Sequence, residues 1–458
     1  MNILEEFDTI TAISTPLGTG GVGIIRISGD KAFDIIKKIF TNPNFEPRKF
    51  NHGKIKDGNI TIDEVVVLPF FAPNSYTGEN VIEIQCHGGI NVVKNILELV
   101  LKNGARMAEK GEFTKRAFLN KRMDLSQAEA VADIIHSKTS DFAKISMKNL
   151  SGVLKDEINK IRNDIFEILS KITAAIDFPE EVNEPEYEYL TETFEKIISK
   201  INKVLAGART SNIMRQGISV AIAGKPNVGK SSLFNALLNL ERAIVTDIAG
   251  TTRDVLRETL DLGIPVTLID TAGIRETEDI VESIGIGKAF EAGRASDMIF
   301  YMVPPDMTTE EAFTGVSVIA EDCDCIIAVF SKSDAGTNPY RSEIEERFAT
   351  IGITEFISIS AEEEFNIDKI EDAIIDYYNE LGGGASEGLL ITNSRHYTKF
   401  LKATKKLAMA LDALDNELGT EGCASTLRAC LDEIGEVTGK TVSATLADTI
   451  FSRFCIGK

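Results

Sequence analysis

The feature that most constrains this chain is a phosphate-binding loop set between an apolar strand and an apolar helix. Residues 224–231 read GKPNVGKS, the spacing GxxxxGK[ST], and the apolar run 218–223 precedes them directly. A loop of this kind surrounds phosphate groups with backbone N–H donors at a helix N-terminus, while its lysine reaches the β and γ oxygens and its serine holds Mg²⁺. A glycine-rich turn without a ligand is the alternative, and the agreement of spacing with strand and helix context argues against it. We therefore predict a nucleotide-binding domain.

The rest of the chain is organised around this domain. From 218 to about 380, short apolar strands alternate with helical segments, which predicts a mostly parallel sheet with helices on both faces. Apolar residues recur every three or four positions along 144–176, which predicts one long helix there, and along 191–206. The same period resumes after the GGG at 382–384. Helices on both flanks bury their apolar stripes most simply in one helical domain that carries the α/β domain as an insertion.

We accordingly predict an α/β multidomain chain, a division that agrees with its length of 458 residues. The expected domains are an α/β domain over 1–120, the first part of the helical domain over 121–213, the nucleotide-binding domain over 214–383 and the second helical part over 384–458. The first domain mixes β-rich runs with short helical stretches such as 90–102.

Composition bears on location and on redox state. No run of about 18 apolar residues occurs, and MNILEEFDTI has acids where a signal peptide would be basic, so we expect a soluble cytoplasmic protein without a membrane partner. Six cysteines without a CxxC pair are expected to be reduced thiols. Cys323 and Cys325 lack neighbouring His and Cys partners, which argues against a metal site there.

The excess of negative charge lies in one part of the chain. The formal net charge is −21, and residues 214–383 hold 13 Lys and Arg against 31 Asp and Glu. Because neutralising a nucleic-acid backbone requires Lys and Arg, an RNA contact is expected on the neutral segments 1–120 and 384–458 or on a partner protein.

Two segments after the loop are expected to complete the phosphate and Mg²⁺ site. A strand ends at Asp270, whose carboxylate would face Mg²⁺, and the Gly273 amide would meet the γ-phosphate. Thr252, in GTTRD at 250–254, is a second candidate Mg²⁺ ligand.

The segment SKSD at 331–334 indicates which base is bound. Asp334 can accept from the N1–H and the exocyclic amine of guanine, a donor pair that adenine lacks, so GTP is favoured over ATP. Ser331 stands where GTPases usually have Asn, which puts either a base contact or a loop brace in question. Ser360 and Ala361 resemble the last guanine-contacting element.

In this chain, a group other than a glutamine side chain must orient the water molecule that attacks the γ-phosphate. Ile274 follows Gly273 where Ras-like proteins place a water-orienting Gln, and a hydrocarbon cannot orient water. An acid such as Glu282 or Glu276, a partner's arginine or an extra cation remain as alternatives. The chain's own loop arginines, Arg253, Arg257 and Arg275, more commonly form surface ion pairs.

Motifs along the whole chain resemble the MnmE family, also called TrmE, of tRNA wobble-uridine modification GTPases. They are GVGIIRISG, NSYTGENVIEIQCHGG, GEFTKRAFLN and DLSQAEA in the N-terminal part, GKPNVGKS, TDIAGTTRD and DTAGIRETEDIVESIG in the centre, and FCIGK at the end. A central GTPase insertion combined with a terminal Cys-x-Gly-Lys is found in few families.

The resemblance implies a K⁺-stimulated GTPase that works on tRNA with the flavin-dependent protein MnmG in a heterotetramer or larger complex. The expected product carries a carboxymethylaminomethyl or aminomethyl group on C5 of the wobble uridine, with 5,10-methylene-tetrahydrofolate as one-carbon donor and 5-formyl-tetrahydrofolate as its analogue. The first domain would resemble folate-dependent aminomethyltransferases and form a homodimer. GTP hydrolysis would drive association and conformational change of the GTPase (G) domains.

Site residues follow from the same resemblance, position by position. The folate-contacting positions match Arg26, Glu83, Arg122 and Lys458, and the family's essential thiol matches Cys455. Without the resemblance, Arg26 and Glu83 would be read as an ordinary ion-pair partner and a solvated strand-edge acid. Many relatives have Lys at the position of Arg122. Lysine offers a single compact ammonium donor, whereas the planar guanidinium of arginine offers several N–H donors in a fixed geometry.

The GTPase machinery is matched in the same way. K⁺ would be coordinated by Asn227, Thr246, Ile248 and Thr251, and Glu282 would activate water. Mg²⁺ would be held by Ser231 and Thr252. The remaining GTP-binding positions are Val228, Gly229, Lys230, Ser232, Asp247, Ala249, Gly250, Asp270, Thr271, Ala272, Gly273, Lys332, Asp334, Ser360 and Ala361.

Two other functions are compatible with parts of this pattern. A stand-alone regulatory switch, such as a ribosome-assembly GTPase, would use the first domain only as an RNA or protein adaptor. An ATPase of the same fold is disfavoured by Asp334. Binding of a reduced folate separates the leading interpretation from the switch.

Overall fold

The computed structural model describes residues 8–47, 49–206, 214–215, 217–239, 257–270, 296–320, 323, 325–381, 391–415 and 419–458. Its internal contacts divide the chain into two compact units. Unit 1 comprises Met1–Ile135, Ser146–Leu205 and Asn393–Lys458, and unit 2 comprises His136–Ile145 and Ala206–Thr392. The predicted four-part boundaries at 120, 213 and 383 stay a prediction.

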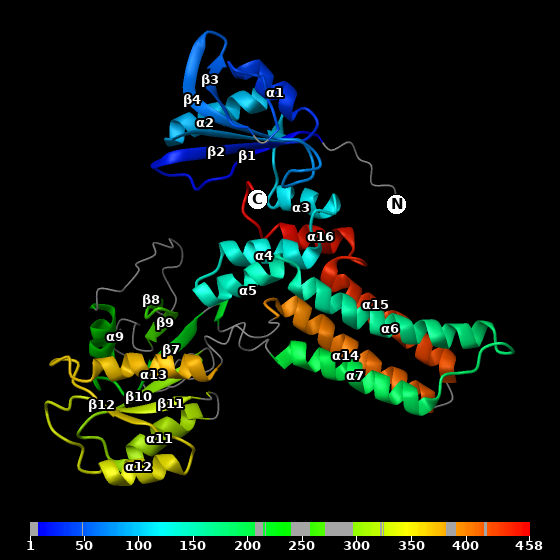
Figure 1. The fold of residues 1–458 in the computed structure, drawn as a ribbon. Coiled ribbons are helices and arrows are strands. Elements are labelled where there is room, and N and C mark those ends of the chain that lie inside the picture. Colours follow the sequence, from blue (N-terminus) through cyan, green and yellow to red (C-terminus); the bar gives the residue numbers. More distant parts are fainter. Residues whose placement is uncertain are drawn as a thin grey trace. The chain divides into compact units, whose positions relative to one another are not determined.

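Unit 1 begins with a six-stranded sheet in the order β3-β4-β5-β2-β1-β6. The strands are β1 (Ile10–Ile13), β2 (Gly20–Ser28), β3 (Asn51–Asp57), β4 (Ile60–Phe70), β5 (Val81–Gly88) and β6 (Arg106–Met107). Helices α1 (Ala32–Ile39) and α2 (Ile90–Lys102) cover one face, as Figure 1 shows. Alternate apolar residues of β2 and β5 pack under them, so this sheet has its own core.

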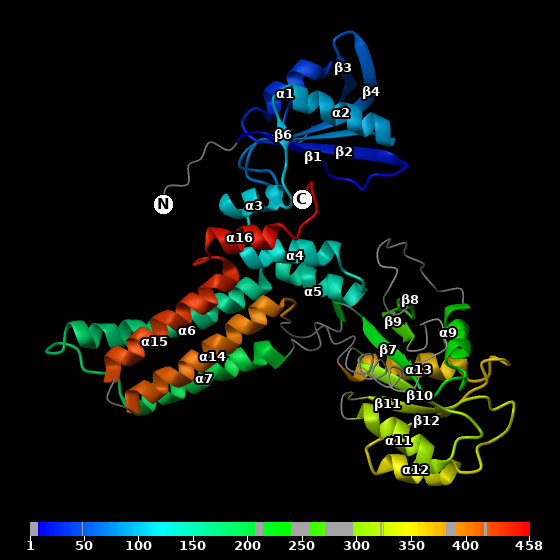
Figure 2. The same cartoon turned by 180° about the vertical axis from the view of Figure 1, so that it is seen from behind.

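The remainder of unit 1 is helical, and helices from both ends of the chain pack together in it. The helices are α3 (Glu112–Leu119), α4 (Leu125–Ile135), α6 (Val153–Asp177), α7 (Tyr187–Ala206), α14 (Ser394–Asp415), α15 (Gly419–Thr438) and α16 (Ala444–Phe451). Helix α15 packs against both α14 and α6, and α16 packs against α3 (Figure 2). The predicted helical assembly of the two flanks is therefore present.

The long helix predicted over 144–176 is two helices. Helix α5 (Ser140–Leu150) ends before Gly152, whose φ of +101° lies in the left-handed region, and α6 begins at the next residue. Periodicity alone missed this break because the apolar stripe continues through it, and only the glycine marks the conformation.

Unit 2 contains a six-stranded sheet in the order β12-β11-β10-β7-β9-β8, parallel except for the edge strand β8. The strands are β7 (Ile218–Ala223), β8 (Arg257–Asp261), β9 (Pro265–Asp270), β10 (Met298–Val303), β11 (Ile326–Phe330) and β12 (Phe356–Ser358). The helices are α9 (Lys230–Asn239), α11 (Thr309–Ala320), α12 (Arg341–Ala349) and α13 (Ile367–Glu380). They lie on both faces of the sheet, the arrangement of a doubly wound α/β domain (Figure 1).

The core of unit 2 includes residues from outside the predicted domain. Phe142 and Ile145, at the start of α5, are buried in the same apolar cluster as Met214 and the central strands. The Thr139 hydroxyl donates to the Met214 carbonyl oxygen at 2.7 Å. The segment 136–145 is therefore part of unit 2, although residues 146–205 separate it from the rest of that unit.

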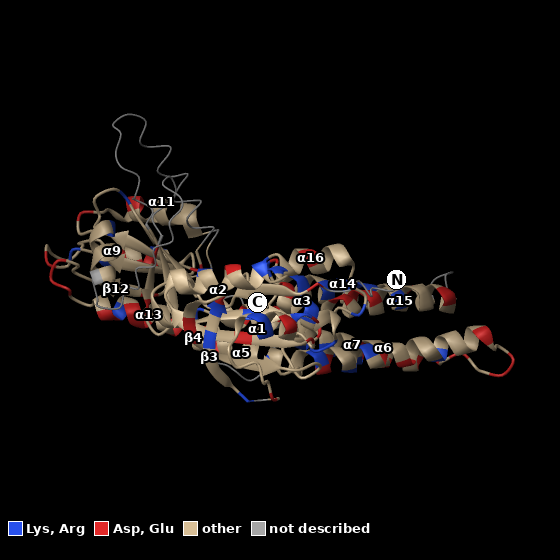
Figure 3. Cartoon of the chain, turned by 90° about the horizontal axis from the view of Figure 1, so that it is seen from above, with Lys and Arg blue, Asp and Glu red and all other residues tan. Residues whose placement is uncertain are grey.

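Charge is unevenly spread over the helices and loops, as Figure 3 shows. Acids gather at the loop between α6 and α7, where Glu180, Glu181, Glu184 and Glu186 are exposed. In the described part of the chain, no helix has both the length and the apolar character needed to cross a bilayer.

Candidate functional site

The phosphate loop has the strand–loop–helix geometry that its sequence predicts. It follows β7 and ends where α9 begins at Lys230, so the first free N–H groups of the helix point to the loop. Gly224 and Gly229 have φ of +145° and +102°. The Lys230 ammonium is buried and donates to the carbonyl oxygens of Gly224 and Lys225 at 2.8 and 2.6 Å. Ser231 and Ser232 are exposed in the first turn of α9.

A second segment of unit 2 braces this loop. The buried Ser331 hydroxyl donates to the Val228 carbonyl oxygen at 2.8 Å. The Lys332 ammonium donates to the Asn227 carbonyl oxygen at 2.9 Å. Asn227 and Lys332 both have positive φ, +62° and +54° respectively. The backbone of each segment therefore turns tightly where the two segments meet. The phosphate loop and the predicted base-binding segment are thus joined by two hydrogen bonds.

The base-binding residues lie at the carboxyl ends of neighbouring strands. Asp334 follows β11, and the buried Ser360 follows β12. The Ser360 hydroxyl donates to Asp334 Oδ1 at 2.6 Å, and it accepts from the Glu363 backbone N–H at 3.2 Å. The Asp334 carboxylate is exposed and fixed on one oxygen, which leaves its other oxygen available to a ligand. Ala361, next in the chain, is half-buried.

Asp270 ends β9, and its backbone is in register with Ile222 of β7. Because parallel strands end at a common edge, Asp270 lies at the edge from which the phosphate loop leaves the sheet. The other predicted residues of this site lie outside the described residues: Thr246, Asp247, Ile248, Ala249, Gly250, Thr251, Thr252, Thr271, Ala272, Gly273 and Glu282.

A second cluster lies in unit 1, on the N-terminal sheet. Arg26 of β2 and Glu83 of β5 are directly paired in register. Arg26 Nη2 and Nε approach Glu83 Oε1 at 2.7 and 2.9 Å, and both side chains are largely buried. The Arg26 guanidinium also lies over the rings of Tyr76 and Phe113, 5.3 and 5.6 Å from their centroids.

The C-terminal tail reaches this cluster from the other end of the chain. Ile456 pairs with Lys110, and the Gly457 carbonyl oxygen accepts from the Ser14 hydroxyl at 3.3 Å and from Arg26 Nη1 at 3.4 Å. Burial lowers the pKa of the Lys458 ammonium, the Arg26 charge lowers it further, and Glu83 and Cys455 act in the opposite direction. The structure therefore brings Arg26, Glu83 and Lys458 together.

Arg122 contacts a loop beside the cluster. Its Nε donates to the Ser75 carbonyl oxygen at 3.1 Å, and its side chain packs on Gly78. Tyr76 of the same loop contacts Arg26, so Arg122 is connected to the other three residues through 75–78.

Among the six cysteines, Cys455 is the exposed one. Burial raises the pKa of Cys86 and Cys423 to about 11 and that of Cys430 to about 12, which keeps these three as thiols at neutral pH. An accessible thiol therefore lies next to the Arg26 cluster.

Comparison with known proteins identifies the chain. The family model for the MnmE helical domain matches residues 125–455, and the model for the GTP-binding protein TrmE N-terminus matches residues 9–122. The tRNA modification GTPase MnmE of Caldicellulosiruptor saccharolyticus is 44% identical, over 99% of this chain and 100% of the relative. The chain belongs to the MnmE family. The proteins of the same description from Alkaliphilus oremlandii and Carboxydothermus hydrogenoformans are 41% and 42% identical over 98% of this chain and 99% of each relative.

Membership of the MnmE family confirms the predicted enzyme class, a GTPase, and agrees with the phosphate loop and sheet of unit 2. Sequence reasoning missed Tyr76 and Phe113, the rings beside Arg26. Both occur in motifs that support the MnmE resemblance, NSYTGEN and GEFTKR, but no spacing rule marks an aromatic residue as a neighbour of a distant arginine.

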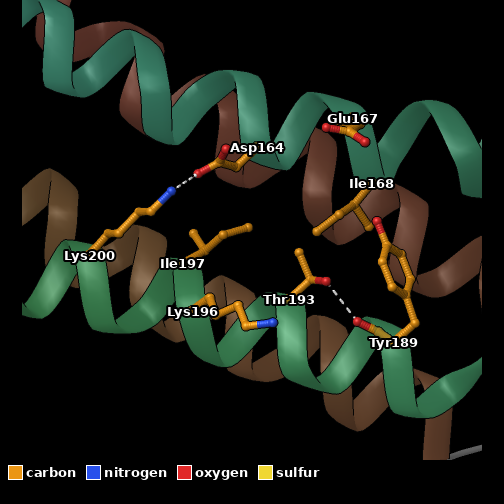
Figure 4. Close-up of a pocket in the computed structure, with 8 residues that line it drawn as sticks. All are labelled: Asp164, Glu167, Ile168, Tyr189, Thr193, Lys196, Ile197 and Lys200. Atoms are coloured by element: carbon orange, nitrogen blue, oxygen red, sulfur yellow. Dashed lines mark hydrogen bonds and ion pairs between the residues drawn. The ribbon is translucent and has the colours of Figure 1, made fainter.

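A pocket between α6 and α7 is separate from both clusters (Figure 4). It has a volume of about 160 Å³, below the roughly 300 Å³ at which ligand pockets usually begin. Lys200 forms an ion pair with Asp164 across it at 2.6 Å. We assign no ligand to it.

Proposed function

We propose that the chain is a K⁺-stimulated GTPase that, with the flavoprotein MnmG, adds a carboxymethylaminomethyl or aminomethyl group to C5 of the wobble uridine in tRNA. The observation that carries the proposal is the meeting of Arg26 and Glu83 with the Lys458 tail, because these residues come from opposite ends of the chain and were matched to one folate site. A switch that used its first domain only as an adaptor has no need for this arrangement.

The chemistry of the cluster fits a reduced folate. A carboxylate such as Glu83 accepts from the pterin amine and ring N–H, and the cations Arg26, Arg122 and Lys458 suit the ligand's carboxylates or a formyl oxygen. Tyr76 and Phe113 add aromatic surface beside them. When bound, 5,10-methylene-tetrahydrofolate supplies the one-carbon unit, and Cys455 is the thiol proposed to act there.

The GTPase half of the proposal places GTP and Mg²⁺ at the loop that ends with Lys230 and Ser231 at the start of α9. Asn227 is exposed on that loop, where its side chain is available to a K⁺ ion. The proposed partners of Asn227 on K⁺ are Thr246, Ile248 and Thr251, the second Mg²⁺ ligand is Thr252, and Glu282 is the acid that activates water. The protein would act in the cytoplasm as a homodimer, and GTP hydrolysis would drive G-domain association and conformational change.

Binding of 5-formyl-tetrahydrofolate to the full chain tests the proposal. Glu83→Gln removes the charge and one acceptor at nearly constant size, so we expect at least about tenfold weaker binding, the loss of one charged hydrogen bond. Glu98→Gln is the matched control, because Glu98 is exposed on α2 in the same domain. Calorimetry on the two variants and the parent chain measures the difference.

No binding by the parent chain, or equal binding by both variants, would contradict the folate site. Absence of binding by the parent chain would favour the regulatory switch, whose first domain contacts RNA or protein and has no use for a reduced folate. Equal binding by both variants would show that Glu83 does not contact the folate.

A further inference from the structure

Ser331 stands at the position that is usually Asn in GTPases, and its hydrogen bonds are defined. The side chain is 4% exposed, and its Oγ lies 2.8 Å from the Val228 carbonyl oxygen. A carbonyl oxygen carries no hydrogen, so the serine is the donor. The Ser331 backbone N–H donates to the Val303 carbonyl oxygen at 2.9 Å.

A serine hydroxyl has one hydrogen to donate, whereas an asparagine amide has two. Once Ser331 has donated to Val228, its side chain can only accept. Guanine presents N7 and O6 on one edge, and both atoms are acceptors. Ser331 therefore has no donor for this edge of the base, whereas an asparagine could brace the loop with one N–H and keep the other.

The brace itself does not depend on asparagine here. The bond from Ser331 to Val228 is supported by the neighbouring bond from Lys332 Nζ to the Asn227 carbonyl oxygen at 2.9 Å. Two consecutive residues thus hold two consecutive residues of the phosphate loop.

We infer that Ser331 is a positioning residue: it fixes the phosphate loop and donates no hydrogen bond to N7 of guanine. Discrimination between bases then depends on Asp334, which binds the edge with N1–H and the exocyclic amine. This inference rests on the proposed guanine site. Asp334 accepts from N1–H and the exocyclic amine, and its orientation is set by the Ser360 hydroxyl at 2.6 Å. It follows that replacing N7 by a C–H group is tolerated by this chain and discriminated against by a relative with Asn.

The test measures binding of GDP, 7-deaza-GDP and IDP to the full-length chain, to Ser331→Asn and to Ser331→Ala. We expect the parent chain to bind GDP and 7-deaza-GDP within about twofold. Ser331→Asn should prefer GDP over 7-deaza-GDP by roughly two- to tenfold, the contribution of one neutral hydrogen bond. Ser331→Ala loses the brace but no base contact, so its affinity for both nucleotides should fall by one common factor, and Ser331→Asn should restore GDP binding.

Each other outcome overturns the inference. A parent chain that prefers GDP over 7-deaza-GDP as strongly as Ser331→Asn does would show that the serine reads N7. Equal binding of the two nucleotides by Ser331→Asn would show that the residue at 331 does not determine selectivity. Unchanged GDP affinity in Ser331→Ala would show that the hydrogen bond from Ser331 to Val228 does not support nucleotide binding. The comparison of GDP with 7-deaza-GDP on the parent chain does not depend on the folding of any variant.

The IDP measurement separates this inference from the guanine site on which it rests. Hypoxanthine lacks the exocyclic amine, so Asp334 should favour GDP over IDP by about tenfold or more in every variant, since a hydrogen bond to a charged group is lost. Equal binding of GDP and IDP would overturn the guanine site itself.

Discussion

At the residue scale, Gly457 shows how one position controls a site built from two chain ends. Its φ is +93°, and a Cβ there would collide with the Ile13 carbonyl oxygen. Gly104 has a similar φ of +110°, but a Cβ there would meet no atom within 4 Å. Both glycines have positive φ, and of the two only Gly457 lies in close contact with strand β1.

Gly457→Ala should therefore displace the tail from Ile13 and move Lys458 away from Arg26 and Glu83. We expect at least about tenfold weaker 5-formyl-tetrahydrofolate binding with little change in GTP affinity. Gly104→Ala is the control, because it introduces the backbone strain without the collision. Folate affinities that fall equally in both variants would assign the effect to general destabilisation of the N-terminal domain.

At the element scale, one buried carboxylate joins α4 to α14. Glu129 accepts from Asn393 Nδ2 at 2.8 Å, from Arg395 Nη2 at 2.6 Å and from His396 Nε2 at 2.6 Å. Arg395 continues to the Glu436 carbonyl oxygen at the end of α15. Burial alone would raise the pKa of Glu129, but the hydrogen bonds and electrostatic attraction of His396 and Arg395 outweigh burial and lower the pKa to about 2.

This shift predicts a pH dependence of stability. Because the folded-state pKa lies below the ordinary value of 4.5, the stabilisation by Glu129 is complete above pH 4.5 and is lost as the pH falls towards 2. Glu129→Gln should cost about 3 kcal/mol at neutral pH, since it leaves a buried cation without its partner. The difference from the parent chain should shrink below pH 4.5. Urea unfolding followed by circular dichroism across this range measures it.

Glu157→Gln is the matched control on α6, because Glu157 pairs with the exposed Lys160. We expect a change below about 1 kcal/mol and no such pH dependence, as is usual for surface ion pairs. A similar loss in both variants would contradict a special role for the Glu129 cluster.

The elements themselves were largely predictable, and their long-range partners were not. The phosphate-loop motif and the change in the spacing of apolar residues at 218 located β7 and α9. The helical spacing of apolar residues located α2, α6 and α7. The docking of Gly457 on Arg26 joins residues 431 positions apart through a tail too short to show periodicity. The same holds for Phe142, whose burial in unit 2 depends on packing that its own helix pattern does not encode.

At the scale of the whole molecule, the acidity belongs to the nucleotide-binding part of the chain. Residues 214–383 hold 31 Asp and Glu against 13 Lys and Arg, so the proposed pairing of two copies of this domain would bring like charges together. Salt screens this repulsion over a Debye length of about 10 Å at 0.1 M.

GTP-dependent association of the two G domains should accordingly strengthen when choline chloride is added at a fixed K⁺ concentration. Spectroscopic distances between labels on the G domains of the two copies in the proposed full-length dimer report it. Replacing K⁺ by Na⁺ at equal ionic strength is the control and should weaken association at every salt level. Association that is unchanged or weaker with added choline chloride would show that charge repulsion does not limit pairing.

The most direct test of the whole account follows a labelled carbon into RNA. The full-length chain, MnmG, GTP, KCl, unmodified tRNA, ¹³C-labelled methylene-tetrahydrofolate and glycine or ammonium, which supplies the amine of the substituent, are incubated together, and the tRNA nucleosides are analysed by mass spectrometry. The account predicts ¹³C in the C5 substituent of the wobble uridine with the parent chain and with Glu98→Gln, and a strong reduction with Glu83→Gln. Wobble uridine without label in the parent reaction, or full labelling by Glu83→Gln, would contradict it.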